Sequence, residues 1–239
     1  QHQPDEQCAG MNSANDNDDE DVPQAYSSPP CMMHLVDPLS GQVLPEADFR
    51  QQLDLKRWRK AERERLIALR VAIPVEERRR HSARIVEELD KVLGDISGRI
   101  VGVYWPFRGE PDLRSWMEGL GDRGAVCVLP VVVGPQMPLA FRVWRRGDAL
   151  EPGVWNIPVP VEQQEATPDI VISPVVGFDC ACYRLGNGGG FYDRTLAALP
   201  RRPRIVGVGY EKLAIPTIYP QPHDIAMDMI ITEGSILVG

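Results

Sequence analysis

Apolar and polar residues follow a helical period in the first ordered part of this chain. Residues 55–69 carry apolar side chains spaced among many basic ones and contain neither glycine nor proline, which predicts an amphipathic helix. A second helix is expected over 75–93, where Pro74 suits the start, Gly94 suits the end and the apolar positions share one face.

Short apolar runs then replace the helical pattern. Their lengths and flanking residues are typical of buried strands, and the six runs are residues 100–104, 125–129, 139–144, 170–173, 205–208 and 229–232. Helical candidates at 113–120 and 192–199 lie between them. This alternation predicts an α/β domain whose mostly parallel sheet is flanked by helices.

Polar groups or glycines follow several of these strands. Glu110 follows the first run, a glycine-rich segment follows 170–173, and Tyr210 follows 205–208. Ligands of open parallel sheets gather beyond the carboxyl ends of the strands. We therefore expect these groups to share one crevice.

Composition and charge divide the chain into two parts. Its 239 residues are 43% hydrophobic, enough for one sizeable core. Residues 1–30 hold seven acidic side chains and no Lys or Arg, so the net charge of −8 leaves −1 for the remainder. Residues 1–52 are predicted to be an acidic, disordered extension, and residues 53–239 the folded domain.

Several functional classes find no support in the sequence. No apolar run approaches the ~20 residues that cross a bilayer, and no nucleic-acid-binding module is recognisable. Five cysteines form no disulfide framework, and the Cys180–Cys182 spacing does not suit zinc. We expect a cytoplasmic monomer that binds neither nucleic acid nor a membrane.

The segment from Arg184 to Arg194 carries the strongest chemical signal, because four glycines in five positions precede two aromatics and an Asp–Arg pair. Glycines let backbone N–H groups approach an anion closely, and a helix start adds its positive dipole end. The run matches neither of the two commonest phosphate motifs. Taken alone, it could equally be a tight turn between a loop and a helix.

With its flanks, this segment resembles the signature of the 5-formyltetrahydrofolate cyclo-ligase family, also called methenyltetrahydrofolate synthetase. The matching pieces are an apolar strand ending in Pro174, the triplet Gly177-Phe178-Asp179, and the run from Arg184 to Arg194. Further matches around Glu110, Trp155-Asn156-Ile157-Pro158 and 223–228 extend the resemblance over residues 55–239. It implies a three-layer domain similar to the NagB/RpiA/CoA-transferase-like fold.

The resemblance also implies a ligase that forms a carbon–nitrogen bond. Such an enzyme converts 5-formyltetrahydrofolate to 5,10-methenyltetrahydrofolate, with ATP as co-substrate and ADP and phosphate as products. The formyl carbon is amide-like and unreactive until ATP phosphorylates its oxygen. Catalysis then requires positioning and neutralised phosphate charge more than side-chain acid–base chemistry.

Site residues follow from the same resemblance. It implies ATP binding by residues of the first helix and the glycine run, namely Arg59, Lys60, Arg63, Arg184, Leu185, Gly186, Asn187, Gly188, Gly189, Gly190, Phe191 and Tyr192. It implies folate binding by Glu110, Trp155, Phe191 and Tyr192, and Mg²⁺ binding by Asp193 and Asp228. Arg63 is the helix residue favoured for phosphate.

Three positions depart from the family's pattern. Gly189 replaces a Lys of animal-type members, Cys182 replaces a Gly in the turn before the loop, and Arg59 stands where a Lys is usual. The turn at Cys182 must therefore tolerate a Cβ atom. An alternative function is a non-catalytic relative that binds nucleotide or folate in a regulatory or interaction role.

Overall fold

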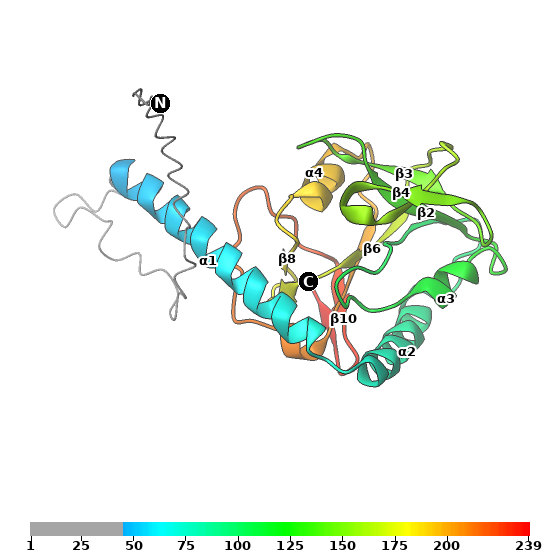
Figure 1. The fold of residues 1–239 in the computed structure, drawn as a ribbon, viewed down its shortest axis with the longest axis horizontal. Coiled ribbons are helices and arrows are strands. Elements are labelled where there is room, and N and C mark those ends of the chain that lie inside the picture. Colours follow the sequence, from blue (N-terminus) through cyan, green and yellow to red (C-terminus); the bar gives the residue numbers. More distant parts are fainter. Residues whose placement is uncertain (1–44) are drawn as a thin grey trace, which may run out of the picture.

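A seven-stranded sheet forms the centre of the computed structural model, which describes residues 45–239 (Figure 1). Its order is β11-β10-β9-β6-β1-β2-β3, and only the edge strands β3 and β11 run antiparallel to their neighbours. This arrangement confirms the predicted mostly parallel α/β sheet. The strands are β1 (Ile100–Gly102), β2 (Val126–Val132), β3 (Leu139–Val143), β6 (Ile170–Pro174), β9 (Arg204–Val208), β10 (Met229–Ile231) and β11 (Ile236–Val238).

The helices are α1 (Pro45–Val71), α2 (Val75–Leu93), α3 (Arg114–Glu118) and α4 (Phe191–Ala198). α2 has the predicted bounds, and Gly94 ends it with a φ of +61°. α1 begins at Pro45, so residues 45–52, which were assigned to the extension, belong to a helix. The prediction for residues 1–44 lies outside the described part of the chain.

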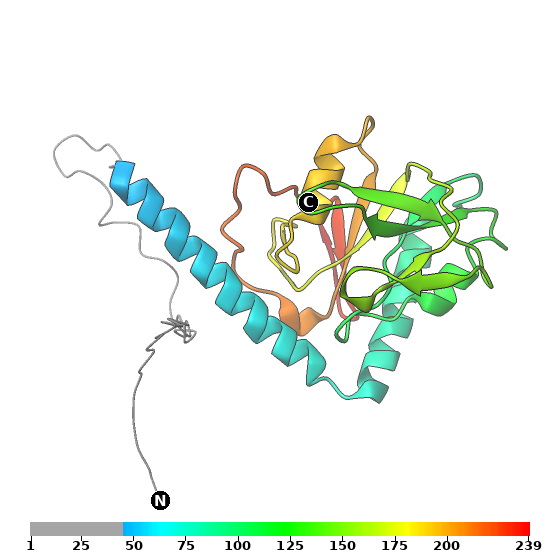
Figure 2. The ribbon, with the colours of Figure 1, turned by 45° about the horizontal axis from the view of Figure 1, so that its top comes forward.

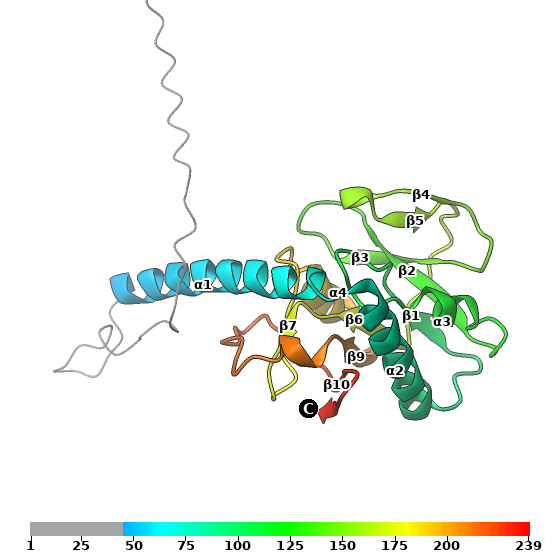
Figure 3. The ribbon, with the colours of Figure 1, turned by 60° about the horizontal axis from the view of Figure 1, so that its bottom comes forward.

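α1 and α2 form two arms of a V (Figure 2), and the amino-terminal half of α1 extends away from the sheet. α2 packs near β10, and α4 packs near β3. Figure 3 shows α3 beside α2, while the small sheet of β4 (Leu150–Pro152) and β5 (Pro158–Pro160) lies beside β2 and β3. Within residues 45–239, no helix is both long and apolar enough to cross a membrane.

The core lies between the sheet and its helices. The central strands contribute fully buried aliphatic residues such as Val101, Val128 and Ile172. α2 buries Ile85 and Leu89 from the face that its apolar spacing predicts. Burial of each such side chain contributes roughly 1.5–3 kcal/mol, so the pattern that predicts these elements also accounts for their packing.

A glycine brings α1 close to the hairpin of β7 (Gly177–Phe178) and β8 (Arg184–Leu185). A Cβ atom on Gly177 would lie 2.5 Å from Cδ1 of the fully buried Leu66. No larger residue fits there without displacement. The contact holds α1 beside the glycine run that follows β8.

The sheet has an opening at the carboxyl end of β1, because this strand is short. β1 pairs with β2 only as far as Val128, whereas β2 continues to Val132 against β3. Pro130 therefore has no neighbouring strand on its β1 side, where its missing N–H costs no ladder bond. Pro130 and Val132 are left to line a cavity.

Candidate active site

A cavity of about 290 Å³ opens at the carboxyl ends of β1, β2 and β6. This is where the parallel sheet was expected to place its ligand. Its walls come from α1, the loop after β1, the β2–β3 ends, the short 3₁₀ segment η2 (Val154–Asn156) and the glycine run. Six aromatic residues line it: Tyr104, Trp105, Phe107, Trp155, Phe191 and Tyr192.

The glycine run forms one wall of this cavity and leads directly into α4. Gly188 has a φ of +97° and Gly190, which precedes the first residue of α4, a φ of +62°. Such angles are strained for residues with a Cβ. A glycine-rich turn at a helix start presents backbone N–H groups and a positive dipole end, so the wall is suited to an anion.

Three cations of α1, Arg59, Lys60 and Arg63, were expected to bind phosphate. Of these, Arg63 contacts the glycine run. Its Nε donates to the Gly186 carbonyl at 2.8 Å, and its guanidinium carbon is 3.7 Å from the position of a Cβ on Gly188. Lys60 is exposed, and neither Lys60 nor Arg63 is among the residues that line the cavity itself.

Arg59 is engaged by another part of the chain. It forms an ion pair with Asp224 at 2.5 Å and donates to the carbonyls of Ile218 and Tyr219. Its guanidinium therefore ties α1 to the loop before β10. In this conformation it is not available to a phosphate in the cavity.

The buried Arg184 and the half-buried Asp193 form an ion pair at the base of the glycine run. Arg184 Nη2 lies 3.1 Å from Asp193 Oδ2, and the guanidinium stands over the Tyr192 ring at 5.4 Å. Arg184 Nη1 is buried and has no hydrogen-bond partner within residues 45–239. A buried, unpaired donor on a cavity wall is a ready contact for an anionic ligand.

Asp228 lies at the other end of the strands. Its Oδ1 pairs with Arg202 at 2.6 Å, and its Oδ2 accepts from the N–H of Ile205 at 2.7 Å. Ile205 is near the start of β9, whereas the cavity lies where parallel strands finish. This placement does not support the expectation that Asp228 and Asp193 share a metal ion.

A metal ion would therefore find few ligands from the chain. No group of three or more His, Cys, Asp or Glu side chains in the described residues is arranged to hold one. Asp193 alone of the expected pair lines the cavity. One carboxylate nevertheless suits Mg²⁺, which usually completes its shell with water and substrate phosphate oxygens.

Glu110 presents a buried carboxylate to the cavity. Oε2 accepts from the N–H of Phe107 at 3.0 Å, and Oε1 accepts from Nδ2 of Asn187 at 3.4 Å. Arg70 Nη1 lies 3.6 Å from Oε1. Burial raises the pKa of Glu110, while Arg70 and the two hydrogen bonds oppose that rise.

Trp155 stands at the mouth of the cavity with 55% of its surface exposed and a φ of +55°. Its ring meets Phe191 edge to face, with centroids 6.0 Å apart. The neighbouring Tyr192 is a neutral phenol, because burial raises its pKa above the ordinary value. These rings offer stacking surfaces to a flat ligand.

A statistical model of the 5-formyltetrahydrofolate cyclo-ligase family matches residues 55–233. The chain belongs to this family. A 5-formyltetrahydrofolate cyclo-ligase of Mycolicibacterium smegmatis is 33% identical over 145 residues, which cover 57% of this chain and 75% of that protein. The cyclo-ligase of Escherichia coli K12 is 28% identical over 148 residues, covering 59% and 81%.

Solved structures agree with this membership. The NMR structure of the 5,10-methenyltetrahydrofolate synthetase of Aquifex aeolicus has a TM-score of 0.66 and 28% identity, covering 75% of the cyclo-ligase described here and 92% of that chain. The Mycoplasma pneumoniae synthetase shares the fold at a TM-score of 0.60 and 23% identity, covering 73% and 98%.

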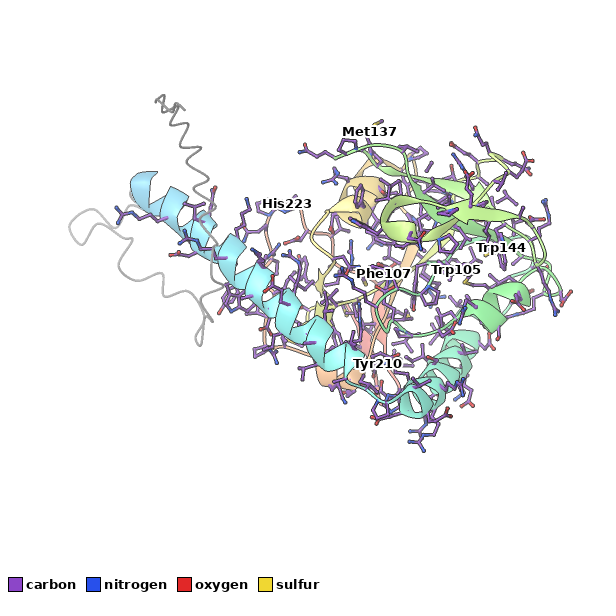
Figure 4. The ribbon with its side chains drawn as sticks, in the orientation of Figure 1. Trp105, Phe107, Met137, Trp144, Tyr210 and His223 are labelled. Atoms are coloured by element: carbon purple, nitrogen blue, oxygen red, sulfur yellow. The ribbon has the colours of Figure 1, made fainter. Side chains whose placement is uncertain are left out.

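Several residues of the cyclo-ligase cavity region were missed from the sequence, Tyr104 among them. Trp105, Phe107 and Arg108 line the cavity from the loop after β1 (Figure 4 labels the two aromatics). Their place directly after a predicted strand was a usable signal. Arg70, the partner of Glu110, gave no such signal, because it is one of many basic residues in its helix.

Proposed function

We propose that this cyclo-ligase couples ATP cleavage to ring closure of 5-formyltetrahydrofolate, giving 5,10-methenyltetrahydrofolate, ADP and phosphate. The observation that carries the proposal is that the glycine run and Glu110 wall the same cavity. Asn187 of that run donates to Glu110. A phosphate cradle and an acceptor for a pterin are thus adjacent, as transfer between two bound substrates requires.

The chemistry starts from an unreactive formyl group on N5. Transfer of the γ-phosphoryl group to the formyl oxygen makes that oxygen a good leaving group and the carbon an electrophile. N10 then attacks the carbon and loses its proton, and the phosphate departs with the former formyl oxygen. Since the chain need only hold both substrates in line and stabilise phosphate charge, positioning supplies most of the catalysis.

The roles of individual residues follow from their positions. Gly186, Gly189 and Gly190 supply close backbone approach to phosphate, while Arg63 and Arg184 supply positive charge. Mg²⁺, when bound, would neutralise phosphate oxygens, with Asp193 as its protein carboxylate.

The folate would be held by residues next to the glycine run. Glu110 would accept hydrogen bonds from the donor edge of the pterin, and Trp155, Phe191 and Tyr192 would contact its rings. Of the other helix cations, Arg59 and Lys60 would reach phosphate only after a rearrangement of α1 or of the loop that Arg59 holds.

A reducing, cytoplasmic location and a monomeric state are part of the proposal. The reducing location is supported by the three described cysteines, Cys127, Cys180 and Cys182, which are all free thiols.

The test is direct. Purified protein is mixed with 5-formyltetrahydrofolate, Mg²⁺ and ATP, and the near-ultraviolet absorbance of the methenyl product is followed beside a measurement of ADP. We expect equal amounts of the two products and none without ATP. Folate binding without any turnover would instead show a non-catalytic member of the family.

A further inference from the structure

Arg70 is the largest fully buried side chain of the described residues, and the cyclo-ligase chemistry above assigns it no role. It sits in the last turn of α1 and reaches the loop that carries Glu110. A buried guanidinium is costly to desolvate unless its partners are well placed. Its contacts therefore indicate what it is built to hold.

Two of those contacts reach the loop that carries Glu110, a third reaches the backbone after β6, and Nη2 is buried without a hydrogen-bond partner within residues 45–239. Nε donates to the carbonyl of Arg108 at 2.9 Å, and Nη1 donates to the carbonyl of Val175 at 3.4 Å while facing Glu110 Oε1 at 3.6 Å. Arg70 thus fixes both the backbone of the loop after β1 and the carboxylate that this loop presents.

We propose that Arg70 is a positioning residue for folate, which keeps the Glu110 carboxylate charged and aimed at the cavity. The inference rests on the proposed function, in which Glu110 accepts hydrogen bonds from the pterin. A neutral Glu110 would place a donor where the pterin also offers donors, so one hydrogen bond would become a repulsive contact.

Arg70 is the cation paired with Glu110, at 3.6 Å, while Arg108 and Arg184 line the same cavity without an ion pair or hydrogen bond to this carboxylate in the described structure. The other partners of Glu110 are the Phe107 N–H and the Asn187 amide. Tyr104 and Tyr192 also face it, and burial raises the pKa of both phenols, so they stay neutral across the working pH range. Removing Arg70 would leave burial to raise the pKa of Glu110 without the opposing charge of its ion-pair partner.

The experiment compares Arg70→Met, Arg70→Gln and Arg70→Lys with Arg79→Met, a control on the exposed face of α2. KM for 5-formyltetrahydrofolate and KM for ATP are measured from pH 6 to pH 8. We expect Arg70→Met and Arg70→Gln to raise the folate KM about tenfold or more, as loss of an orienting partner commonly does. The ATP KM and the control should change less than about twofold.

The pH profile separates positioning from a general loss of structure. In the two neutral variants Glu110 becomes protonated as pH falls, so their folate KM should rise more steeply toward pH 6 than that of the unmodified protein. Arg70→Lys keeps the charge and should restore a shallow profile. Should Arg70→Met fail to fold, the Gln and Lys variants carry the comparison.

Three results would overturn the inference: an unchanged folate KM, equal rises in the folate and ATP KM values, or identical pH profiles for Arg70→Lys and Arg70→Gln. Absence of turnover in the unmodified protein would instead reject the proposed function. The positioning role would then be judged by direct titration of 5-formyltetrahydrofolate without ATP over the same pH range, with the same expected order of variants.

Discussion

Asp179 is a single buried carboxylate that organises the turn leading into the glycine run. Oδ1 accepts from the N–H groups of Ala181 and Tyr183 at 3.1 Å each, and Oδ2 accepts from the N–H of Ile218 at 3.0 Å. Between them, the fully buried Cys182 has a φ of +60°. Charge-assisted bonds of this kind contribute about 1.5–3 kcal/mol each, which is enough to hold a Cβ-bearing residue in a conformation that favours glycine.

At the same scale, substitutions can distinguish the roles of Asp193 and Asp228, the two aspartates that were expected to share a metal ion. Asp193→Asn removes a carboxylate that lines the cavity, so we expect turnover to fall by about 10²-fold or more, with folate binding changed far less. Steady-state rates and a folate titration measure the two effects.

The matched variant is Asp228→Asn, which alters a carboxylate paired with Arg202 at the amino ends of the strands. We expect its turnover to stay within about twofold of the unmodified protein, since surface changes away from a site have small effects. Equal losses in both variants would show that the position of Asp228 in the structure is not the one used in catalysis.

At the scale of elements, the proposed function gives a role to the face of α1 that meets the glycine run. Arg63 lies on this face, whereas Arg65 is exposed and pairs with Glu62. Arg63→Met should raise the KM for ATP by about ten- to a hundredfold, the usual value of a hydrogen bond to a charged group. Arg65→Met should leave that KM unchanged, and a similar rise in both would mean that α1 acts only through its general positive charge.

The close contact of α1 with β7 is expected to affect the stability of the fold through side-chain packing. Gly177→Ala would place a methyl group against Leu66, so we expect a loss of about 1–3 kcal/mol in the free energy of unfolding, measured in urea. Gly121→Ala is the control, because no heavy atom lies within 4 Å of its new Cβ. Equal stability of the two variants would contradict the close approach.

The pattern of the sequence predicted the elements that are long or fully buried and missed those that are short. All six predicted strands are present, and burial of the central ones on both faces requires uninterrupted apolar runs. β4 and β5 were missed because Pro152, Pro158 and Pro160 argue against strands, although a two-stranded ribbon tolerates proline at its edges.

For the site, the sequence predicted that Glu110 and the glycine run meet, because both follow strands of a parallel sheet. The same rule places Asp228, which directly precedes a strand, at the opposite end, as the structure has it. The pairing of Arg70 with Glu110 joins residues 40 positions apart through tertiary packing. No local pattern could indicate it.

At the scale of the whole molecule, the middle of α1 is joined to the rest of the fold. Arg59 ties this helix to the loop before β10, and Trp58 meets Tyr219 of that loop edge to face at 4.9 Å. Asp193 in turn accepts from the N–H of Ile225. The helix, the loop and the start of α4 are therefore joined into one unit beside the cavity.

Truncation tests the extent of that unit. A chain beginning at Pro45 should retain the kcat of the full protein, because the described contacts with the cavity all lie beyond that residue. A chain beginning at Lys60 lacks Trp58 and Arg59, so it should unfold at lower temperature and lose turnover. Thermal melts and the absorbance assay measure these outcomes. A fully active chain beginning at Lys60 would show that the connection between α1 and the loop is dispensable.

The exposed position of Trp155 makes tryptophan fluorescence a probe of ligand binding. Trp155 is the only exposed tryptophan of five, the others being buried or half-buried, and it lines the cavity. Because Trp155 is 55% exposed, we expect its indole emission to shift to shorter wavelength when a pterin displaces water from it. Each molecule thus carries its own fluorescent reporter of occupancy, readable without label or turnover.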